Sequence, residues 1–488
     1  MSARKLVLAV VDGMAPAMLG RAIAEGRAPA LRAIAERGTL IAEGAAAAFP
    51  SVTPVCAGAI GTGALQDVHH IPSLNWWSRA ERRYVEYGSS LRAAYRFGIA
   101  RQLTDTVFNM NMEHLSPDAT TVFEALDDAG VRTAGTTYLI YRGRHRHDVS
   151  RELALSRIAA ALWRRSVLGP AELFYADMFA SRETGCRSQM GLPGMRDRHA
   201  GCVAEHLVAN DLFDFLLLSL PDNDNHSHRY GPMAQGASIA EADRQIVRMM
   251  DAGGGVDRFL DDHAMIVVAD HSHAPIARRC DLGDAFSSWT VMGPGARTRD
   301  AEIALCPNAR AAMVYVLVDE ARERLARPLA EAGLASDGVE LAMFRCGGEA
   351  VVLRSGPPGR TRRELRFAAG GDVRDERGAA WSVEGDLSVL SATVRDGALR
   401  TPEYPNALAR VWAALHCPTS GDVLLSAAPG WEFADWGGVD HVGGGSHGSL
   451  HVSDSMGALA FCGVRPPHDH GAWSIADMTP MVRAHFDA

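Results

Sequence analysis

Apolar residues occur along the chain as short runs that alternate with stretches of helical periodicity. The first run, Leu6–Val11, is apolar and partly β-branched on both faces, which is typical of a buried parallel strand. A helical pattern follows over residues 15–37. Further strands are predicted at 132–138, 213–220, 265–269, 423–425 and 458–461, and a further helix over 239–251. Strands alternating with helices favour an α/β fold with a mostly parallel sheet covered by helices on both faces.

Two regions interrupt this alternation. Residues 300–415 carry their own elements: a strand near 313–318, a helix over 320–332, a strand at 350–354 and a Gly/Pro/Arg turn at 355–360. We therefore interpret 300–415 as an inserted α+β subdomain, with 1–299 and 416–488 forming the main α/β core. The stretch 142–198 is rich in Arg and His and shows helical periodicity only over 152–165.

Composition narrows the class of protein. With 488 residues, 47% hydrophobic and 22% charged, the chain can bury a large core. A net charge of -9 disfavours a nucleic-acid polymer as partner. No apolar run approaches the roughly 18 residues of a membrane span. Because the first apolar run is short and ends at Asp12, we interpret it as a strand and expect a cytoplasmic protein. The eight cysteines form no C-x-x-C pair, so we expect reduced thiols.

Acidic residues and histidines follow, or in one case precede, four of the predicted strands. Asp12 follows the first strand, Asp222–His228 the strand ending at Leu220, and Asp270–His273 the strand ending at Ala269. His447 lies in a Gly-rich segment before the last strand. Since ligands bind at the carboxyl ends of parallel strands, these side chains should converge at one edge of the sheet. Carboxylates and neutral imidazoles there predict a site for zinc or a similar divalent ion.

Two features of this pattern leave alternatives open. The segment 222–228 holds two overlapping Asp-x-x-x-His pairs, Asp222 with His226 and Asp224 with His228, and spacing does not choose between them. In an extended segment both pairs would lie on the same face. Thr53, which precedes Pro54, could begin a helix or act as a hydroxyl nucleophile whose pKa a bound metal lowers.

The order of the motifs resembles the alkaline phosphatase superfamily, in particular its nucleotide pyrophosphatase/phosphodiesterase branch. The matching segments are V-D-G-M (11–14), F-P-S-V-T-P (49–54), H-H-I-P-S-L-N-W-W (69–77), D-N-H-S-H-R-Y-G-P (224–232), A-D-H-S-H (269–273) and S-H-G-S (446–449). They cover residues 6–290 and about 420–465, and leave 300–415 uncovered. The resemblance implies an alkaline-phosphatase-like fold.

The resemblance also implies a two-zinc phosphoester hydrolase. One ion would be held by Asp12, Thr53, Asp270 and His271, and the other by Asp224, His228 and His447. Thr53 would be the nucleophile, forming a phospho-threonine intermediate that water hydrolyses, and Asn75 would donate to a phosphoryl oxygen. The family places its ligand His shortly before Gly-Pro, which favours the pair Asp224 and His228. Asp222 and His226 would then orient the ligands.

Three residues depart from the family pattern: His70 in place of Gly, Cys56 in place of Asn and Ser272 in place of Gly. All three are expected near a small phosphorylated substrate. Because no Arg or Lys adjoins Thr53 in sequence, we expect phosphodiesters or pyrophosphates as substrates, unless the stretch 142–198 supplies a positive charge. The alternatives are a phosphomonoesterase, phosphonate hydrolase or phosphomutase, and a non-catalytic metal-binding protein. The sulfatase motif C/S-x-P-x-R is absent at Ser51 and Cys56.

Other conspicuous side chains receive simpler interpretations. Trp76 and Trp77 are expected to pack in the core or at the rim of the site, with a stacking surface for a base or ring as the alternative. His273, His441 and His451 are expected to lie around the site or at the surface. The segment His145–His147 is expected to be a solvated loop, with a contact to the substrate phosphate as the alternative.

Overall fold

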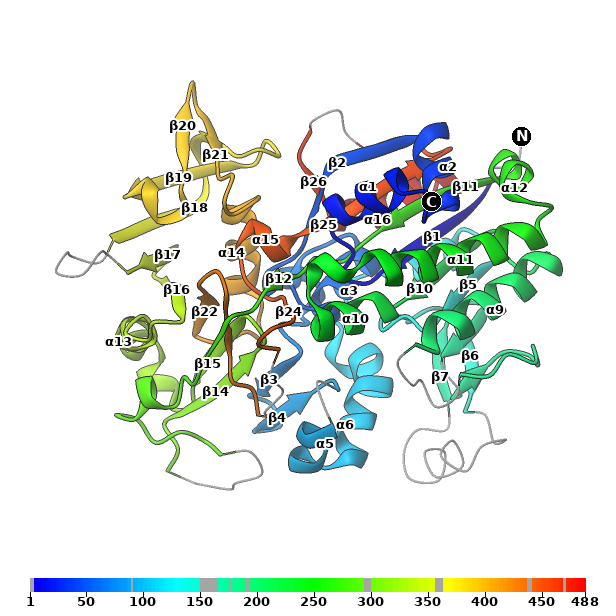
Figure 1. The fold of residues 1–488 in the computed structure, drawn as a ribbon. Helices are drawn as coiled ribbons and strands as arrows, with labels where there is room; N and C mark the ends of the chain where they lie inside the picture. Colours follow the sequence, from blue (N-terminus) through cyan, green and yellow to red (C-terminus); the bar gives the residue numbers. More distant parts are fainter. Residues whose placement is uncertain are drawn as a thin grey trace.

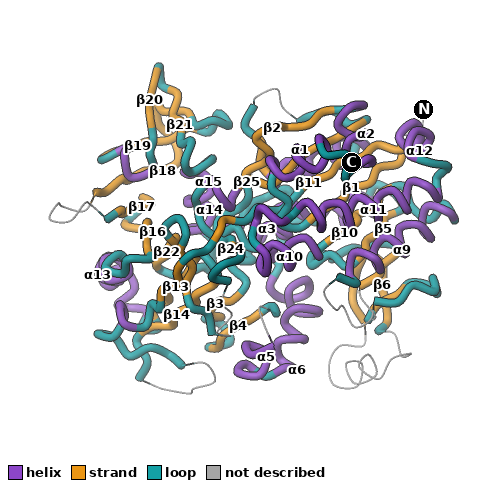
Figure 2. The backbone as a smooth tube through the Cα atoms, viewed as in Figure 1, coloured by secondary structure: helices purple, strands orange, loops and turns teal. Residues whose placement is uncertain are grey.

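The computed structural model describes residues 4–88, 91–149, 166–175, 178–188, 194–293, 300–355, 363–436, 441–467 and 471–488. Within these ranges the chain forms two large sheets that lie side by side (Figure 1). Helices gather around the central sheet, whereas strands dominate the second sheet (Figure 2). The termini lie on the same side of the molecule, where the His485 ring contacts the Arg4 carbonyl.

The central sheet has nine strands and is mostly parallel. Strand β1 (Lys5–Val11) lies between β10 and β11 and runs parallel to both, and β5 and β8 continue the parallel set. The strand order is β26 (Trp473–Ser474), β2 (Thr39–Ala46), β25 (Met456–Cys462), β11 (His263–Val268), β1, β10 (Phe215–Leu220), β5 (Thr133–Thr136), β8 (Glu172–Tyr175) and β9 (Phe179–Ala180).

Both faces of this sheet are covered, which explains why β1 is apolar throughout. Alternate residues of β1 face opposite sides: Val7, Ala9 and Val11 belong to one hydrophobic cluster, and Leu6, Leu8 and Val10 to another. The first cluster is covered by α1 (Pro16–Ala24), α2 (Pro29–Arg37), α9 (Arg196–Ala209), α11 (Gly236–Ala252) and α12 (Val256–Asp262). The second is covered by α3 (Thr53–Thr62), α7 (Val122–Asp128) and α16 (Met478–Phe486).

The second sheet is mostly antiparallel, and its core is continuous with that of the central sheet. Its strands are β14 (Ile303–Asn308), β15 (Ala311–Val316), β22 (Val423–Ala427), β16 (Val339–Cys346), β17 (Glu349–Arg354), β18 (Arg363–Arg374), β21 (Ala398–Arg400) and β20 (Thr393–Arg395), with β19 (Ala380–Gly385) beside β18. One face packs against α13 (Arg322–Gly333), and α14 (Ala407–His416) packs on the other.

Short elements complete the described chain. Two-stranded sheets pair β3 (Asn75–Ser78) with β4 (Arg83–Glu86), β6 (His145–Asp148) with β7 (Ser166–Gly169), β12 (Ala274–Pro275) with β24 (Gly445–Ser446), and β13 (Arg278–Cys280) with β23 (Trp431–Phe433). The remaining helices include α4 (Gln66–His69), α5 (Leu91–Phe97), α6 (Ile99–Thr104), a π-helix (Asp105–His114), α10 (Asp222–Tyr230) and α15 (Val452–Ser455). Within the described ranges, no helix has the length and apolarity needed to cross a membrane.

The predicted α/β fold is confirmed, with differences in detail. The pattern over 15–37 is two helices, because Gly26 adopts φ 69° and Pro29 begins the second. The strand predicted at 423–425 exists as β22, but it pairs with β15 and β16 in the second sheet. The helix predicted over 152–165 and most of the turn at 355–360 lie outside the described residues. The division into core and insertion stays a prediction.

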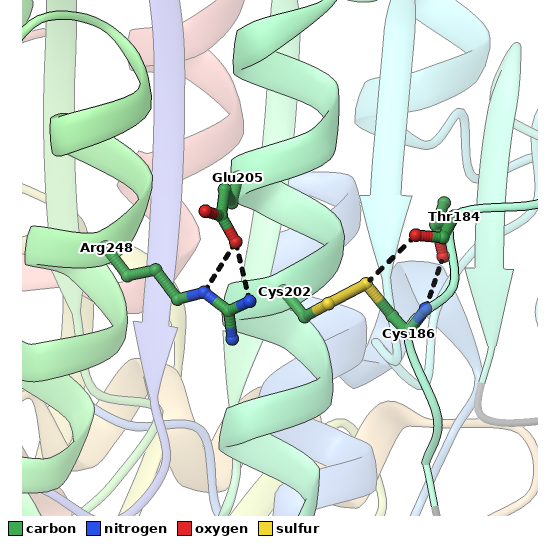
Figure 3. Close-up of a disulfide and its surroundings, with 5 residues drawn as sticks. All are labelled: Thr184, Cys186, Cys202, Glu205 and Arg248. Carbon is green, nitrogen blue, oxygen red and sulfur yellow. Dashed lines mark hydrogen bonds and ion pairs between the residues drawn. A yellow bond between two sulfur atoms is a disulfide. The ribbon is translucent and has the colours of Figure 1, made fainter.

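The expectation of reduced thiols is wrong for two cysteines. Cys186 and Cys202 form a disulfide that ties the segment after β9 to the middle of α9 (Figure 3). No local pattern marks this pair, because only the fold brings together two cysteines with a sequence separation of 16. The other six are free, five of them buried. The predicted cytoplasmic location stays a prediction.

Candidate active site

A cavity of about 790 Å³ opens at the carboxyl ends of the parallel strands. The ends of β1, β10, β11, β5 and β8 form its floor, and α10 and the segment 441–447 form one side. Asn308, the last residue of β14, and Ala309, in the turn to β15, bring the second sheet to its wall. The residues predicted from strand ends therefore converge at one edge, as the pattern indicated.

Two groups of side chains could each hold a metal ion, and we call them the metal-binding groups. The first combines Asp12, Asp270 and His271, whose candidate ligand atoms lie within 4.8 Å of one another. His271 Nε2 lies 3.6 Å from Asp12 Oδ1 and 3.5 Å from Asp270 Oδ2. Asp270 Oδ1 accepts hydrogen bonds from the backbone N–H groups of Gly13 and His271. These bonds fix the carboxylate and leave Oδ2 facing the other two side chains.

The segment after β10 is a helix, α10, not the extended segment we considered. In a helix, residues four apart share a face, so Asp224 and His228 both point into the cavity, with His228 Nε2 3.4 Å from Asp224 Oδ1. The other pair faces away: Asp222 accepts from Arg196 and from the backbone of Asp197. His226 contacts the Ala234 carbonyl. The helix thus separates the two registers that spacing left open.

The second metal-binding group combines Asp224, His271, His273 and His447, again within 4.8 Å. His228 lies beside it, with its Nε2 3.2 Å from that of His447. His271 belongs to both groups and so marks where they meet. Asp224, His228 and His447, which the resemblance assigned to one ion, are brought together by the fold.

Hydrogen bonds to backbone carbonyls orient three of these imidazoles. Nδ1 of His228 lies 2.8 Å from the Gly445 oxygen, and Nδ1 of His447 lies 2.7 Å from the Ser51 oxygen. His271 makes a similar contact of 3.2 Å with Ser272. A carbonyl accepts only, so Nδ1 carries the proton in each case and Nε2 presents its lone pair to the cluster. This is the tautomer that a metal ion requires.

His273 is a site residue that sequence analysis placed outside the centre. Its Nε2 lies 3.0 Å from Asp224 Oδ1. The ring lies against Gly13, where a Cβ would come within 2.7 Å of His273 Nε2, and Gly13 also adopts φ 67°. Position 13 therefore excludes larger residues. The signal was the i+2 spacing in Asp270-His271-Ser272-His273, which we had interpreted as a flanking group.

Burial and charge set the protonation of the cluster. Burial lowers the pKa of His228 to about 3 and holds the pKa values of His273 and His447 below their usual range, so all three are neutral near pH 7. Burial, followed by repulsion from Asp270 and Asp224, raises the pKa of Asp12 well above normal. Burial opposes ionisation of Asp224, whereas the hydrogen bond from His273 favours its ionised form.

This donor set fits divalent cations. Asp12 Oδ1 is buried and has no hydrogen-bond partner among the described residues. Three carboxylates lie close together, which is unfavourable unless positive charge separates them. Neutral imidazoles and carboxylates are ligands that zinc accepts. The cluster thus supplies the number, kind and orientation of donors that a two-ion centre needs.

Thr53 is the first residue of α3 and lines the cavity, with its Oγ1 3.4 Å from His271 Nε2. The positive end of a helix dipole favours negative charge at this position. Ser51, the other hydroxyl nearby, is fully buried: its Oγ donates to the Ser449 carbonyl and accepts from the Gly448 N–H. Ser51 therefore has a structural role, and the hydroxyl that faces the metal-binding groups is that of Thr53.

Asn75 lies at the start of β3 and is buried. Its side-chain nitrogen donates to the Pro307 carbonyl at 2.8 Å, while Oδ1 has no partner within the described chain. Asn75 is not among the described residues that line the cavity, although Leu74 is. Its predicted role as a phosphoryl donor stays a prediction.

The remaining side chains divide between core and rim. Trp76 and Trp77 are buried and make edge contacts with His114 and Tyr84, so they belong to the core. His441 lines the cavity, stacks on His228 at 4.1 Å and contacts Glu432. His451 accepts from the N–H of Ser453 at α15, and His145–Asp148 forms the strand β6.

The three residues that differ from the family pattern do not line the cavity. Neither His70, Cys56 nor Ser272 is among the described residues that line the cavity. Ser272 Oγ donates to the Ser453 carbonyl, and Cys56 is buried in α3. The expectation that these positions bear on the substrate is therefore not supported by their placement.

Comparison with solved structures gives the same fold. Murine ectonucleotide pyrophosphatase/phosphodiesterase 5, an inactive variant in complex with AMP, matches with a TM-score of 0.57 and 11% identity over 99% of this chain and 95% of its own. Phosphonoacetate hydrolase from Sinorhizobium meliloti 1021, in complex with phosphonoacetate, matches with a TM-score of 0.55 and 17% identity over 99% and 96%. The human ectonucleotide pyrophosphatase/phosphodiesterase 5 matches with a TM-score of 0.56 and 12% identity over 99% and 95%.

A search of curated protein sequences finds no significant match to the chain. The sequence profile of the type I phosphodiesterase/nucleotide pyrophosphatase family, in contrast, matches residues 6–450, which include all the residues of both metal-binding groups. With this match, the convergent Asp/His cluster and the shared fold, the chain belongs to the type I phosphodiesterase/nucleotide pyrophosphatase family of the alkaline phosphatase superfamily.

Proposed function

We propose that the protein is a two-zinc hydrolase of phosphodiesters or pyrophosphates and that Thr53 is its nucleophile. One observation carries the proposal: Thr53 adjoins the Asp12/Asp270/His271 group, and the Asp224/His228/His447 group lies beside it in the same cavity. A hydroxyl and two sets of metal donors around one cavity are what in-line displacement at phosphorus needs.

Each part of the chain has a distinct task in this reaction. Asp12, Asp270 and His271 would hold one ion next to Thr53, and Asp224, His228 and His447 would hold the other. When bound, the two ions would lower the pKa of the attacking hydroxyl and neutralise charge that develops on the phosphoryl and leaving oxygens. The orienting carbonyls of Ser51 and Gly445 would keep the imidazoles aimed at the centre.

The covalent steps involve Thr53 alone. Its oxygen forms a bond to phosphorus while the bond from phosphorus to the leaving oxygen breaks, and the leaving oxygen departs with the electron pair. The Thr53 hydroxyl gives up its proton to solvent in this step. Water then attacks phosphorus from the opposite side, the bond from phosphorus to the Thr53 oxygen breaks, and that oxygen regains a proton from the water. The N-terminus of α3 favours the anionic form of this oxygen in both steps.

A second candidate, hydrolysis of phosphomonoesters or phosphonates, is supported by Arg196. The sequence places no basic residue next to Thr53, but Arg196 lines the cavity, and its charge favours ionised Asp12. The stretch 142–198 thus supplies the positive charge that would allow a more anionic substrate. A phosphomutase reaction on the same fold is the third alternative. Both AMP and phosphonoacetate, the ligands of the two similar structures, are small phosphorus compounds.

The test is a substrate panel on wild type, Thr53→Ala and Thr53→Ser. The panel contains nitrophenyl phosphate, a nitrophenyl nucleotide diester and a nitrophenyl phosphonate. We expect the nucleotide diester to be cleaved fastest, Thr53→Ala to lose several orders of magnitude in kcat, and Thr53→Ser to recover a large part. Near-normal turnover by Thr53→Ala would contradict the proposal, and faster cleavage of the monoester or phosphonate would favour the second candidate.

A further inference from the structure

The cavity extends along the edge of the central sheet beyond the metal-binding groups. Asp12 follows β1, and the next strands along the sheet are β10, β5 and β8, whose ends bring Ser219, Thr137 and Tyr175 to the cavity lining. Neighbouring strands lie about 4.8 Å apart, so this second half begins one strand away from Asp12. No carboxylate of β5, β8 or α9 is among the described residues that line it.

Arg196, the first residue of α9, lines this half with a fixed side chain. Its Nε donates to Asp222 Oδ1 at 2.9 Å, and its Nη2 donates to the Pro221 carbonyl at 3.3 Å. No acceptor lies within hydrogen-bond distance of Nη1 in the part of the chain that the structure describes. The side chain is 27% exposed. Asp222 thus holds the guanidinium in place, and one of its edges remains available to a ligand.

Thr137 supplies a second, independent sign that this half binds something. It follows β5, lines the cavity and adopts φ 49°, a left-handed conformation that is rare for a β-branched residue. Its N–H donates to the Phe174 carbonyl at 2.7 Å, which holds the backbone in this conformation. Its Oγ1 is buried and has no partner among the described residues. A strained residue with an unused hydroxyl at a cavity wall is typical of a functional position.

We propose that Arg196 and Thr137 form an anion subsite, so that the substrate carries a second anionic group a few bonds from the phosphorus atom that reacts. The inference rests on the proposed function, because the reacting group must lie at the metal-binding cluster. The Arg196 guanidinium donates a hydrogen bond to the carbonyl of Pro221, which directly follows β10. It is therefore about one strand spacing from the end of β1. That distance suits a carboxylate or a second phosphoryl group attached through a short linker, as in a pyrophosphate or a carboxylated phosphonate.

Three phosphonates of similar size test this. Phosphonoacetate carries a second carboxylate, methylenebisphosphonate carries a second phosphoryl group, and acetonylphosphonate replaces the carboxylate with a neutral methyl ketone of the same shape. Their dissociation constants are measured by titration calorimetry on the metal-loaded Thr53→Ala protein, with and without a second change: Arg196→Met, Arg196→Lys or Thr137→Val. Arg198→Met is the matched control, because Arg198 lies on the same helix but pairs with Glu241 outside the cavity.

We expect phosphonoacetate or methylenebisphosphonate, which carry a second anionic group, to bind about 10- to 100-fold tighter than acetonylphosphonate. Charge-assisted hydrogen bonds to the second group have this effect. Arg196→Met should remove the preference, Arg196→Lys should restore part of it, and Thr137→Val should reduce it by about threefold. Arg198→Met should change none of the constants. The ligand whose affinity depends more strongly on Arg196 identifies the second group as carboxylate or phosphoryl.

Two results would overturn the inference. If Arg196→Met weakened the binding of acetonylphosphonate as much as that of the two ligands with a second anionic group, Arg196 would contact the reacting phosphoryl group instead of a second anion. If all three ligands bound and no change at Arg196 altered their order, the subsite would be absent while the proposed function stood. Failure of all three ligands to bind the metal-loaded protein would count against both the subsite and the proposed function.

Discussion

Arg310 and Asp454 form an ion pair in which neither side chain has exposed surface. Arg310 lies in the turn between β14 and β15, and it also donates to the carbonyls of Ala428 and Trp431. Its backbone N–H donates to the His447 carbonyl at 2.9 Å, and Asp454 accepts from Ser449. The second sheet therefore holds the segment that carries His447, and the metal-binding cluster depends on both sheets.

Breaking this pair should disturb stability and the metal site together. Arg310→Met leaves the buried Asp454 carboxylate without its cation, which typically costs about 3–5 kcal/mol in the free energy of unfolding. The variant should also retain less of the second metal ion, because the His447 segment loses its support. Chemical denaturation and elemental analysis measure both. As a control, Arg21→Met removes an exposed pair with Glu25 and should have little effect. An Arg310→Met protein with normal stability and metal content would show that the ion pair does not support the cluster.

His273 should matter for metal affinity. Removing the His273 imidazole removes the hydrogen bond that orients Asp224. The loss of a group that orients a metal ligand typically weakens metal binding about 10- to 100-fold. The dissociation constant of His273→Ala for zinc, measured by competition with a chelator, tests this. His145→Ala, at an exposed position on β6, should bind zinc like the wild type. Equal affinities for the two variants would place His273 outside the metal centre.

The raised pKa of Asp197 should make the protein less stable as the pH rises. Asp197 is buried, and its Oδ1 accepts the N–H of Asp222; burial and then the charge of Asp222 raise the pKa of Asp197 to about 8 from 3.8. Because the folded state holds this proton more tightly than the unfolded chain, the contribution of Asp197 to stability is complete below pH 3.8 and declines as the pH rises to about 8.

Asp197→Asn should therefore lose less stability than the wild type between pH 5 and pH 9, since Asn accepts the same hydrogen bond and does not ionise. Urea denaturation at several pH values, with metal in excess, measures the difference. Parallel curves for the two proteins would show that Asp197 does not titrate in this range.

The disulfide should stabilise the fold at α9. For a closed loop of about 15 residues, the loss of chain entropy in the unfolded state corresponds to about 3 kcal/mol. The loop between Cys186 and Cys202 has a similar length, with a sequence separation of 16. Cys186→Ser should therefore lower the melting temperature, and a reductant should have no further effect on this variant. Cys346→Ser, which removes a free and half-buried thiol, serves as the control. Unchanged melting of Cys186→Ser would mean that the crosslink adds nothing.

The sequence indicates candidate residues for the site, but not the contacts with which the fold supports them. Asp12, Asp270 and Thr53 are candidates because strand ends and a Thr-Pro helix start are local patterns. The choice between the two pairs in 222–228 depends on the helical geometry of α10, which turns Asp224 toward the cavity and Asp222 away from it. A polar Asp/Asn/His segment gives no hydrophobic period from which to predict that helix.

Contacts between residues distant in the chain could not be predicted from the sequence. Arg196, Arg310 and the disulfide act across separations at which no local pattern connects the partners. The apolar pattern of β22 is that of a buried strand, which would fit either sheet. Only its pairing with β15 and β16 assigns it to the second sheet. His273 was visible as a residue, but its distance from Asp224 depends on how β11 and α10 meet.

The central claim, that Thr53 is the nucleophile, is tested most directly by trapping the covalent intermediate. The metal-loaded protein is mixed with a nitrophenyl nucleotide diester, quenched in acid within one turnover and digested, and the peptides are analysed by mass spectrometry. We predict a nucleotidyl group on Thr53, absent from the corresponding peptide of Thr53→Ala. The same modification on Ser51 instead, or turnover with no modified peptide at any quench time, would contradict the account.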